Sequence, residues 1–271
     1  MSGPREIVAS GPFDNIRSRE LRFLEEASKL GRLTVLLWPD DAVWRVTGRA
    51  PEFPFAERRY VLEAVRFVDK VAVADSALVP GELPAGLQAD VWADYAPTAS
   101  PQRRSSCLRR GIPYREFAPD ELSGFPVPPE NPSSERKKVV VTGCYDWLHS
   151  GHVRFFEQVS QYGELTVIVG NDANVRLLKG DGHPLRSQEE RSYAVGAIKY
   201  VKNALIASGS GWLDADPEIQ RLKPDIYAVN DDGDRGGKRE YCLANGIDYL
   251  VLSRVPAPGL PRRSSTDLRG F

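Results

Sequence analysis

The stretch Thr142-Gly-Cys-Tyr-Asp-Trp-Leu-His-Ser-Gly-His152 follows directly on the apolar run Val139-Val-Val141. It contains an H-x-G-H core, formed by His149, Gly151 and His152, and the chain has only one other histidine among its 271 residues. A short, wholly apolar run bounded by Thr-Gly is typical of a strand in a buried parallel sheet. The sequence therefore predicts a turn here, from the carboxyl end of a strand into a helix.

A second copy of this stretch lies earlier in the chain. Ser10–Leu37 aligns without a gap with Thr142–Val169, and about two identities would be expected from average composition. The 11 residues of the first segment that are identical in the second are Gly11, Asp14, Ser18, Arg22, Phe23, Glu25, Ser28, Gly31, Leu33, Thr34 and Val35. Further along, at an offset of 135, Asp90, Cys107, Gly111 and Tyr114 match Asp225, Cys242, Gly246 and Tyr249. This pattern predicts a duplicated domain.

The boundary between the copies is marked by the proline-rich, polar segment that begins at Pro126 and ends at Lys138. Such a segment cannot continue a helix or a central strand. We expect a first domain over residues 1–125, a linker over 126–137 and a second domain over 138–271. Strands alternate with helices in each copy, which predicts two tandem, Rossmann-like α/β domains, each with a doubly wound parallel sheet.

In the second copy, the spacing of apolar residues predicts each element after the first strand. We expect helices over about Gly151–Tyr162 and Glu189–Tyr200, and one ending near Asn245-Gly246. We expect strands over Leu165–Val169, Asp225–Val229 and Tyr249–Leu252.

The bulk composition narrows the class of protein. A formal net charge of −1 gives no reason to expect nucleic acid or an anionic membrane as a partner. The first residues lack a basic-then-apolar signal pattern, and no apolar run approaches the roughly 18 residues that span a bilayer. The three cysteines lack paired spacing, which disfavours a disulfide framework and a zinc site. We expect a soluble, cytoplasmic protein.

The H-x-G-H stretch is suited to phosphate chemistry. Ligands of parallel sheets bind at the carboxyl ends of the strands, and the free N–H groups of a helix start favour phosphate. His149 precedes the expected helix and His152 begins it, so both imidazoles can face one small volume. Gly151 lets the backbone approach a phosphate closely. Two imidazole donors would stabilise the charge that develops on a transferring phosphoryl group.

The segment resembles the nucleotidyltransferase superfamily marked by H-x-G-H, and in particular its cytidylyltransferase-like branch. Further stretches match this family in order along residues 137–271. They are Asn171-Asp-Ala-Asn-Val-Arg-Leu-Leu-Lys179-Gly180, Gln188-Glu-Glu-Arg191 with Ala197-Ile-Lys-Tyr-Val201, and Arg263-Ser-Ser-Thr-Asp-Leu268, the last being close to ethanolamine-phosphate cytidylyltransferases.

The resemblance implies roles for individual residues. His149, His152 and Lys179 would be catalytic, and Arg191 and Arg254 would contact the substrate. The nucleotide would be bound by Thr142, Gly143, Cys144, Tyr145, Asp146, Gly151, Asn230, Asp231, Arg263, Ser264, Ser265 and Thr266. Since no acidic metal cage is evident, Mg²⁺ is expected to be carried with the nucleotide.

The implied reaction transfers CMP from CTP to a small phosphomonoester or phosphonate, similar to phosphoethanolamine or glycerol 3-phosphate, and releases pyrophosphate. Leu178-Lys-Gly-Asp-Gly-His-Pro184 also resembles adenylyltransferases of the heptose-1-phosphate type, so ATP is an alternative to CTP. An alternative of another class is a nucleotide-binding scaffold without turnover. Members of the family usually pair two such domains, which implies an internal pseudo-dimer and permits a homodimer.

The first copy has lost the phosphate-handling residues. Arg17, Arg19 and Glu20 stand where the second copy has its two histidines and the glycine between them. An acidic residue at this helix start would repel a triphosphate. We therefore expect the first domain to be non-catalytic.

Overall fold

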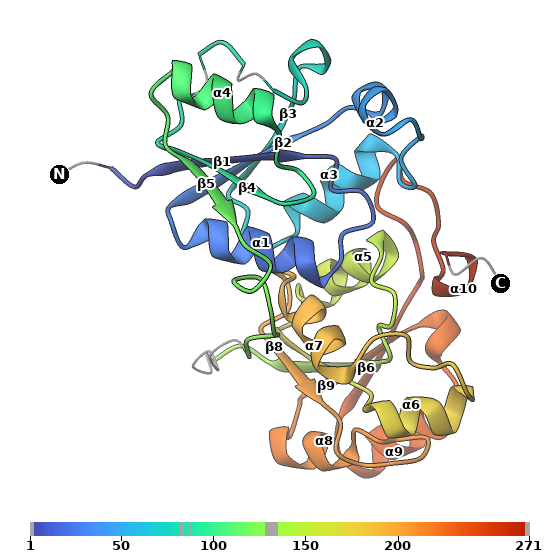
Figure 1. The fold of residues 1–271 in the computed structure, drawn as a ribbon. Coiled ribbons are helices and arrows are strands. Elements are labelled where there is room, and N and C mark those ends of the chain that lie inside the picture. Colours follow the sequence, from blue (N-terminus) through green and yellow to red (C-terminus); the bar gives the residue numbers. More distant parts are fainter. Residues whose placement is uncertain (1–2, 82–83, 87, 128–134, 269–271) are drawn as a thin grey trace. The chain divides into compact units, whose positions relative to one another are not determined.

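The computed structural model of the chain describes residues 3–81, 84–86, 88–127 and 135–268 (Figure 1). The chain divides into two compact units, Met1–Gly124 and Phe125–Phe271. Residues 128–134 of the expected linker lie outside the described residues. In the part of the chain that the structure describes, no helix has the length and apolar character needed to cross a membrane.

The first unit contains a five-stranded sheet in the order β3-β2-β1-β4-β5, and all of its pairings are parallel. Helices α1 and α3 cover one face and α4 the other (Figure 1). The elements are β1 (Glu6–Gly11), α1 (Ser18–Ser28), β2 (Arg32–Leu37), α2 (Asp40–Thr47), α3 (Phe55–Glu63), β3 (Lys70–Val73), η1 (Ser76–Leu78), β4 (Val91–Tyr95), α4 (Pro101–Arg109) and β5 (Tyr114–Phe117).

The second unit contains a parallel five-stranded sheet in the order β10-β9-β6-β7-β8. Helices α5 and α7 lie on one face, and α8 and α9 on the other (Figure 1). The elements are β6 (Lys138–Gly143), α5 (Ser150–Val159), β7 (Glu164–Val169), α6 (Asp172–Lys179), α7 (Gln188–Gly196), β8 (Asn203–Ile206), α8 (Asp216–Leu222), β9 (Ile226–Asn230), η2 (Asp231–Gly233), α9 (Lys238–Ala244), β10 (Asp248–Leu252) and α10 (Ser265–Leu268).

Both sheets follow one topology. In each unit the first strand is central, the second and third strands extend the sheet on one side, and the fourth and fifth on the other. The order in which successive strands are added to the sheet therefore reverses at β1 in the first unit and at β6 in the second. The expected fold class, parallel Rossmann-like α/β sheets, is confirmed. The reversal point matters because ligands of such sheets bind in the crevice at the carboxyl strand ends there.

Burial explains why the first strand of the second unit is central. Val139, Val140 and Val141 are at most 1% exposed, because helices cover both faces of β6. On the face of α8 and α9, a core cluster joins the sheet to these helices. Its buried members are Val140, Ile168, Ala207, Ala215, Ile219, Tyr227, Val229 and Cys242.

Two expected helices end earlier than the apolar spacing indicated: α5 ends at Val159 and not near Tyr162, and the difference is larger for α7. Helix α7 ends at Gly196, whereas the sequence pattern extended it to Tyr200. The N–H groups of Ala197 and Ile198 bond to carbonyls of the last turn, and Lys202 N–H then donates to the Leu165 carbonyl. The apolar residues after Gly196 thus belong to a tight turn that delivers the chain into β8, and not to a further helical turn.

Candidate active site

The two histidines of the H-x-G-H stretch form a stacked pair. His149 is the N-cap of α5, and its Nδ1 accepts a hydrogen bond of 3.1 Å from the Gly151 N–H. The imidazole rings of His149 and His152 lie 4.0 Å apart between centroids, at 28° to each other. A Cβ on Gly151 would lie 2.9 Å from His149 Cε1. Gly151 is therefore needed to admit this imidazole, a role that the sequence interpretation had not included.

His152 is held as a neutral imidazole. Its pKa is well below the usual value, first because burial disfavours the charged form, and then because His149, Arg254 and Lys179 add positive charge nearby. Its Nδ1 is buried and has no hydrogen-bond partner among the described residues. An anionic ligand would raise this pKa by offsetting both effects.

The turn before the histidines is strained in the same way in both units. Tyr145 has a φ of 53°, and Phe13, at the equivalent position, has a φ of 42°. Bulky residues rarely adopt this left-handed conformation. The Tyr145 ring packs edge-on against His152 and covers Gly143, where a Cβ would lie 2.8 Å from the ring. Gly143 and Tyr145 thus shape the wall on which His152 rests.

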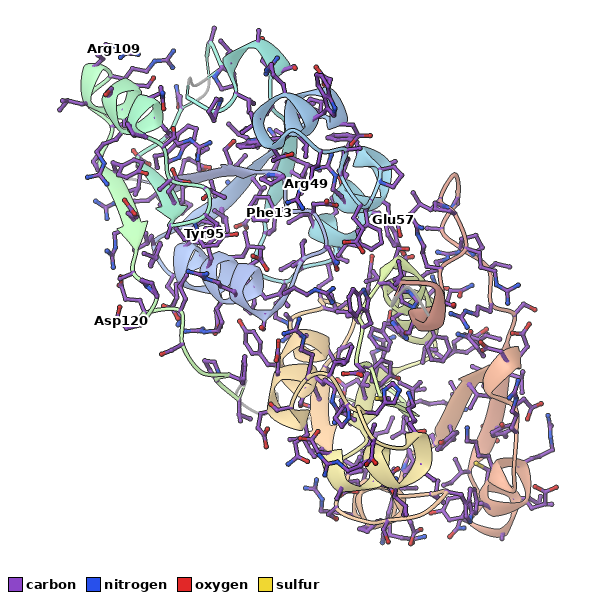
Figure 2. All side chains as sticks on the ribbon, turned by 45° about the vertical axis from the view of Figure 1, so that its right-hand side comes forward. Phe13, Arg49, Glu57, Tyr95, Arg109 and Asp120 are labelled. Carbon is purple, nitrogen blue, oxygen red and sulfur yellow. The ribbon has the colours of Figure 1, made fainter. Side chains whose placement is uncertain are left out.

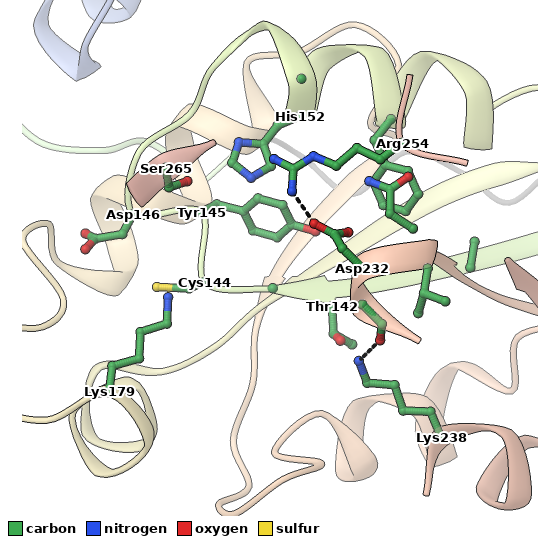
Figure 3. A pocket seen from close by; sticks show the side chains of 17 residues that line it. Thr142, Cys144, Tyr145, Asp146, His152, Lys179, Asp232, Lys238, Arg254 and Ser265 are labelled. Carbon is green, nitrogen blue, oxygen red and sulfur yellow. Dashed lines mark hydrogen bonds and ion pairs between the residues drawn. The ribbon is translucent and has the colours of Figure 1, made fainter. Parts of the chain in front are cut away.

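A cavity of about 230 Å³ opens beside the histidines at the carboxyl end of the sheet (Figure 3). It brings together residues from five separated segments of the second unit. Its lining consists of Thr142, Gly143, Cys144, Tyr145, Asp146, Gly151, His152, Phe155, Lys179, Ala228, Val229, Asn230, Asp232, Gly233, Lys238, Arg254 and Ser265.

Positive charge dominates this pocket. Lys179 ends α6 and is exposed at the pocket mouth, and Arg254 lies near His152 (Figure 3). Arg254 forms an ion pair with Asp232 and donates a 2.8 Å hydrogen bond to the Arg263 carbonyl. It therefore joins the loop after β9 to the carboxyl-terminal segment. The expected placement of Arg254 at the site fits this geometry.

The acidic stretch after β9 lies at the pocket in a different arrangement from the one expected. Asn230 lines the pocket, and its Oδ1 is buried without a partner among the described residues. Asp231 was expected to bind nucleotide, but its carboxylate accepts from the N–H groups of Asp232 and Arg254. The pocket instead receives the side chain of Asp232, because the tight η2 turn directs the two carboxylates to different sides.

Asp146 holds a loop against the site. Its buried carboxylate accepts from the N–H groups of Leu185 and Arg186, at 2.8 to 3.0 Å. The equivalent Asp14 accepts from Glu52 and Phe53 in the same manner. Since the contact is present in both units, its first function is to fix the loop.

Arg191 is not a substrate contact, which corrects the expectation from the sequence. The side chain is 1% exposed and is absent from the pocket lining. It donates to the carbonyls of Arg186, Cys144 and Gly170 and pairs with Asp172. Its hydrogen-bonding capacity is thereby used inside the fold. Arg58 makes the same set of contacts in the first unit, with the carbonyls of Phe53, Pro12 and Trp38 and with Asp40.

The carboxyl-terminal serine-threonine segment reaches the pocket through Ser265. Its Oγ lies 3.5 Å from the Trp147 carbonyl. The Ser264 carbonyl accepts a hydrogen bond from the Leu268 N–H in the short helix α10. Arg263 and Arg254 both line a small cavity that adjoins the pocket. The side chain of Thr266, another expected nucleotide ligand, lies outside the described residues.

Sequence reasoning missed two pocket residues, the aromatic Phe155 and the cationic Lys238. Two signals were available for Lys238. Lys238 comes after β9, which lies next to β6 in the sheet. At the offset of 135 it also aligns with Arg103 of the first unit.

In the equivalent region of the first unit, the side chains bond to one another. Glu20, at the position of His152, accepts from the Arg17 N–H and from the Tyr95 hydroxyl at 3.1 Å. Tyr95 lies beside α1 (Figure 2). Arg103 and Asp94 form an ion pair of 2.7 Å, and their side chains are at most 1% exposed. These internal contacts stand where the second unit has His152 and Lys238.

Comparison with known proteins places the chain in a family. A family model described as cytidylyltransferase-like matches residues 140–269. The FAD synthase of Pyrococcus horikoshii is 41% identical over 104 residues, which cover 37% of this chain and 68% of that protein. The FAD synthase of Ferroglobus placidus is 38% identical over 119 residues, covering 43% of this chain and 74% of that protein.

Other relatives are much longer than the matching region. The bifunctional protein HldE of Campylobacter concisus is 34% identical over 99 residues, so the match spans 20% of that protein. A lipopolysaccharide core biosynthesis protein of known structure, from Thermoplasma volcanium, covers 45% of this chain and 98% of its own, with 22% identity and a TM-score of 0.38.

The fold and the stacked histidines at a strand-to-helix turn define a nucleotidyltransferase domain. The chain belongs to the cytidylyltransferase-like family of nucleotidyltransferases. The family resemblance and the enzyme class expected from the sequence are thus confirmed.

Proposed function

We propose that the second unit transfers a nucleotidyl group from a nucleoside triphosphate to a small phosphorylated acceptor and releases pyrophosphate. The observation that carries this proposal is His152, stacked on the buried His149 at a helix start, in a pocket that His152 lines together with Lys179 and Arg254. A neutral imidazole, a helix amino terminus and two cations suit a group that gains negative charge as it transfers.

The reaction needs positioning and electrostatics rather than a covalent enzyme intermediate. A phosphate or phosphonate oxygen of the acceptor attacks the α-phosphorus, and the bond from this phosphorus to the pyrophosphate oxygen breaks. His152 and Lys179 would donate to the oxygens on which charge accumulates. Each such donor typically contributes about 10²–10³ in rate.

Mg²⁺ would neutralise part of the triphosphate charge when it is bound with the nucleotide. The two carboxylates of the pocket are already engaged, Asp146 by backbone N–H groups and Asp232 by Arg254. Within the described residues, no three His, Cys, Asp or Glu side chains are grouped to hold a metal ion. We therefore expect the triphosphate, and not a protein cage, to carry the metal.

CTP and ATP are the two nucleotides to distinguish. CTP is supported by the match to the cytidylyltransferase-like family model and by the Ser265-Thr-Asp-Leu268 segment. ATP is supported by the relatives named FAD synthase, because FAD contains an AMP unit joined to a flavin phosphate. The acceptor would be a phosphomonoester or phosphonate, with phosphoethanolamine and glycerol 3-phosphate as first candidates.

We also propose that the first unit is a duplicated, non-catalytic copy that acts as an internal pseudo-dimer partner. Glu20 and the Arg103–Asp94 pair occupy the positions where the second unit has His152 and Lys238. The matching strand order and the shared Arg58 and Arg191 contacts support the duplication. Residual pyrophosphate release by a full-length His152→Ala protein that a further Glu20→Gln change abolishes would contradict the non-catalytic assignment.

The test is pyrophosphate release by the full chain, with CTP, ATP, GTP and UTP each supplied with Mg²⁺ and pooled phosphomonoesters and phosphonates. His152→Ala is expected to lower the rate at least about 100-fold. Glu20→Gln, at the equivalent position of the first unit, is the matched control and should keep the rate. Thermal stabilisation by a nucleotide with no product from any acceptor would favour a nucleotide-binding scaffold instead.

A further inference from the structure

Lys238 is a half-buried cation that the H-x-G-H chemistry does not use. It begins α9, directly after the loop that follows β9, and it is one of the residues that line the pocket. Among the described residues, its Nζ donates one hydrogen bond, to the Gly233 carbonyl at 3.0 Å. No carboxylate among the described residues lies within ion-pair distance of Nζ.

The residue of the first unit that is equivalent to Lys238 shows how a cation at this position can be neutralised by the protein itself. Arg103, the equivalent residue, is neutralised by buried Asp94 and also donates to the Thr98 and Pro80 carbonyls. In the second unit Val229 stands in place of Asp94, and Gly233 in place of Thr98. The cation has been kept while its counter-charge and its hydroxyl neighbour are missing. The same position therefore serves packing in one unit and is left open toward a pocket in the other.

The topology separates Lys238 from Lys179. Lys179 follows β7, on one side of β6, and Lys238 follows β9, on the other side. Figure 3 accordingly shows the two lysines on opposite sides of Thr142, with His152 and Arg254 between them and above. A nucleotidyl transfer brings two phosphorylated reactants together at the histidines, so the two sides of the pocket must hold different molecules or different parts of them.

The β9 side also presents a group that needs a hydrogen-bond donor. The buried Oδ1 of Asn230 has no partner among the described residues. An ionised triphosphate offers no donors, whereas the ribose hydroxyls and the exocyclic amines of CTP and ATP do. Asn230 and Lys238 together thus offer one acceptor and one charged donor, which suits the nucleoside part of a nucleotide better than a phosphate chain.

We propose that Lys238 is a nucleotide-binding residue that donates a hydrogen bond to an oxygen or nitrogen of the nucleoside part, on the β9 side of the pocket. This inference rests on the proposed nucleotidyltransferase function. It goes beyond that function by dividing the pocket into a nucleoside end at Lys238 and Asn230 and a phosphate end at His152, Lys179 and Arg254.

Burial supports a ligand-binding role over a packing role. The pKa of Lys238 is lowered, chiefly because burial disfavours the charged ammonium, and Asp234 offsets this only in part. A charge that the fold disfavours does not stabilise the free protein. The Lys238→Met variant should accordingly unfold at the same temperature as the parent or at a higher one.

The experiment compares binding of MgATP, MgCTP and inorganic pyrophosphate by the full chain, using isothermal titration calorimetry. Lys238→Met is expected to raise the Kd of the nucleotide that the parent binds by about tenfold or more, since a charged hydrogen bond is lost. The Kd of pyrophosphate should stay within about twofold, and Lys238→Arg should recover part of the nucleotide affinity. Lys223→Met is the matched control, since Lys223 is an exposed lysine at the amino-terminal end of β9.

Each outcome separates this inference from the proposed function. Equal nucleotide affinity for the parent and Lys238→Met would overturn the role of Lys238 while leaving the transferase proposal intact. An equal loss of pyrophosphate affinity would place Lys238 at the phosphate end and so contradict the proposal. Absence of nucleotide binding by the parent would overturn the proposed function, and this inference with it.

Discussion

The imidazoles of His149 and His152 stack with their centroids 4.0 Å apart, and the Gly151 N–H fixes the ring of His149 at the helix start. Two protonated imidazoles at this separation would repel strongly in a buried site. Burial is the main cause of the lowered pKa of His152, and the nearby His149 lowers it further. The pair is therefore set to receive an anion, because a bound phosphate would remove the electrostatic penalty for protonating His152.

The ligand-free protein should lose stability in mildly acidic solution. The folded state keeps His152 neutral while the unfolded chain protonates this residue below its usual pKa of 6.5, so the unfolded state binds more protons there. As pH falls below 6.5, this residue should reduce the free energy of unfolding by up to about 1.4 kcal/mol per pH unit. Urea unfolding between pH 5 and 7.5, a range of roughly one unit either side of a usual histidine pKa, measures the effect. Retention of the full slope in His152→Asn would contradict it.

Gly151→Ala should impair catalysis by moving His149. The new Cβ would lie 2.9 to 3.0 Å from two atoms of the imidazole, which must then rotate away from the helix start. We expect pyrophosphate release to fall by about 10²–10³, with a small change in stability. Gly237→Ala is the control, because its Cβ would lie 3.5 Å from the nearest Trp212 atom, an ordinary contact. A Gly151→Ala protein with parental activity would show that the position of His149 is unimportant.

Arg191→Met should destabilise the protein rather than weaken substrate binding. The substitution leaves the carbonyls of Cys144 and Gly170 without their donor and Asp172 without its partner. A loss of about 3 kcal/mol or more is expected from a buried network of this kind. Arg58→Met should cause a similar loss of stability in the first unit, which we propose to be non-catalytic. Urea unfolding of both variants checks this, and a raised KM with unchanged stability for Arg191→Met would restore the substrate role.

Cys144 should report nucleotide binding through its rate of alkylation. It lines the pocket and is partly exposed, whereas Cys107 and Cys242 are at most 1% exposed. Treatment with N-ethylmaleimide should modify Cys144 first, and saturating nucleotide should slow this reaction at least about tenfold, as expected at a nucleotide concentration of ten times Kd or above. Peptide mass spectrometry measures each cysteine separately. An unchanged Cys144 rate with nucleotide bound would place the nucleotide elsewhere.

Local patterns were sufficient for the elements around the site. The valine run of β6 and the polar turn after it predicted a buried strand that leads into a helix with His149 at its start, and the structure has both. The predicted end of helix α7 was wrong, because the apolar residues of the following turn have the same spacing as a helix face. A sequence pattern records which residues are buried but not whether they remain helical.

Prediction of the site residues was likewise successful where residue type and spacing are informative, and it failed where burial and neighbours decide. The sequence indicated the pair of histidines and Lys179 because residue type and spacing carry that chemistry. It misjudged Arg191 and missed Lys238, since an arginine directed into the fold and a lysine directed into a pocket look alike until their neighbours are known. Comparison of the two units separates such cases, because contacts kept in both serve the scaffold.

The sequence by itself determined the parallel α/β fold, the family and the histidine pair, because apolar periodicity and motif spacing are local along the chain. Only the tertiary structure decided which charges are free to bind a ligand. Asp232 forms an ion pair with Arg254, and Arg191 donates its hydrogen bonds to backbone carbonyls. Lys238 lacks the counter-charge that Asp94 provides for Arg103. The reason is physical: the availability of a charged group depends on partners that are distant in sequence and adjacent only in the fold.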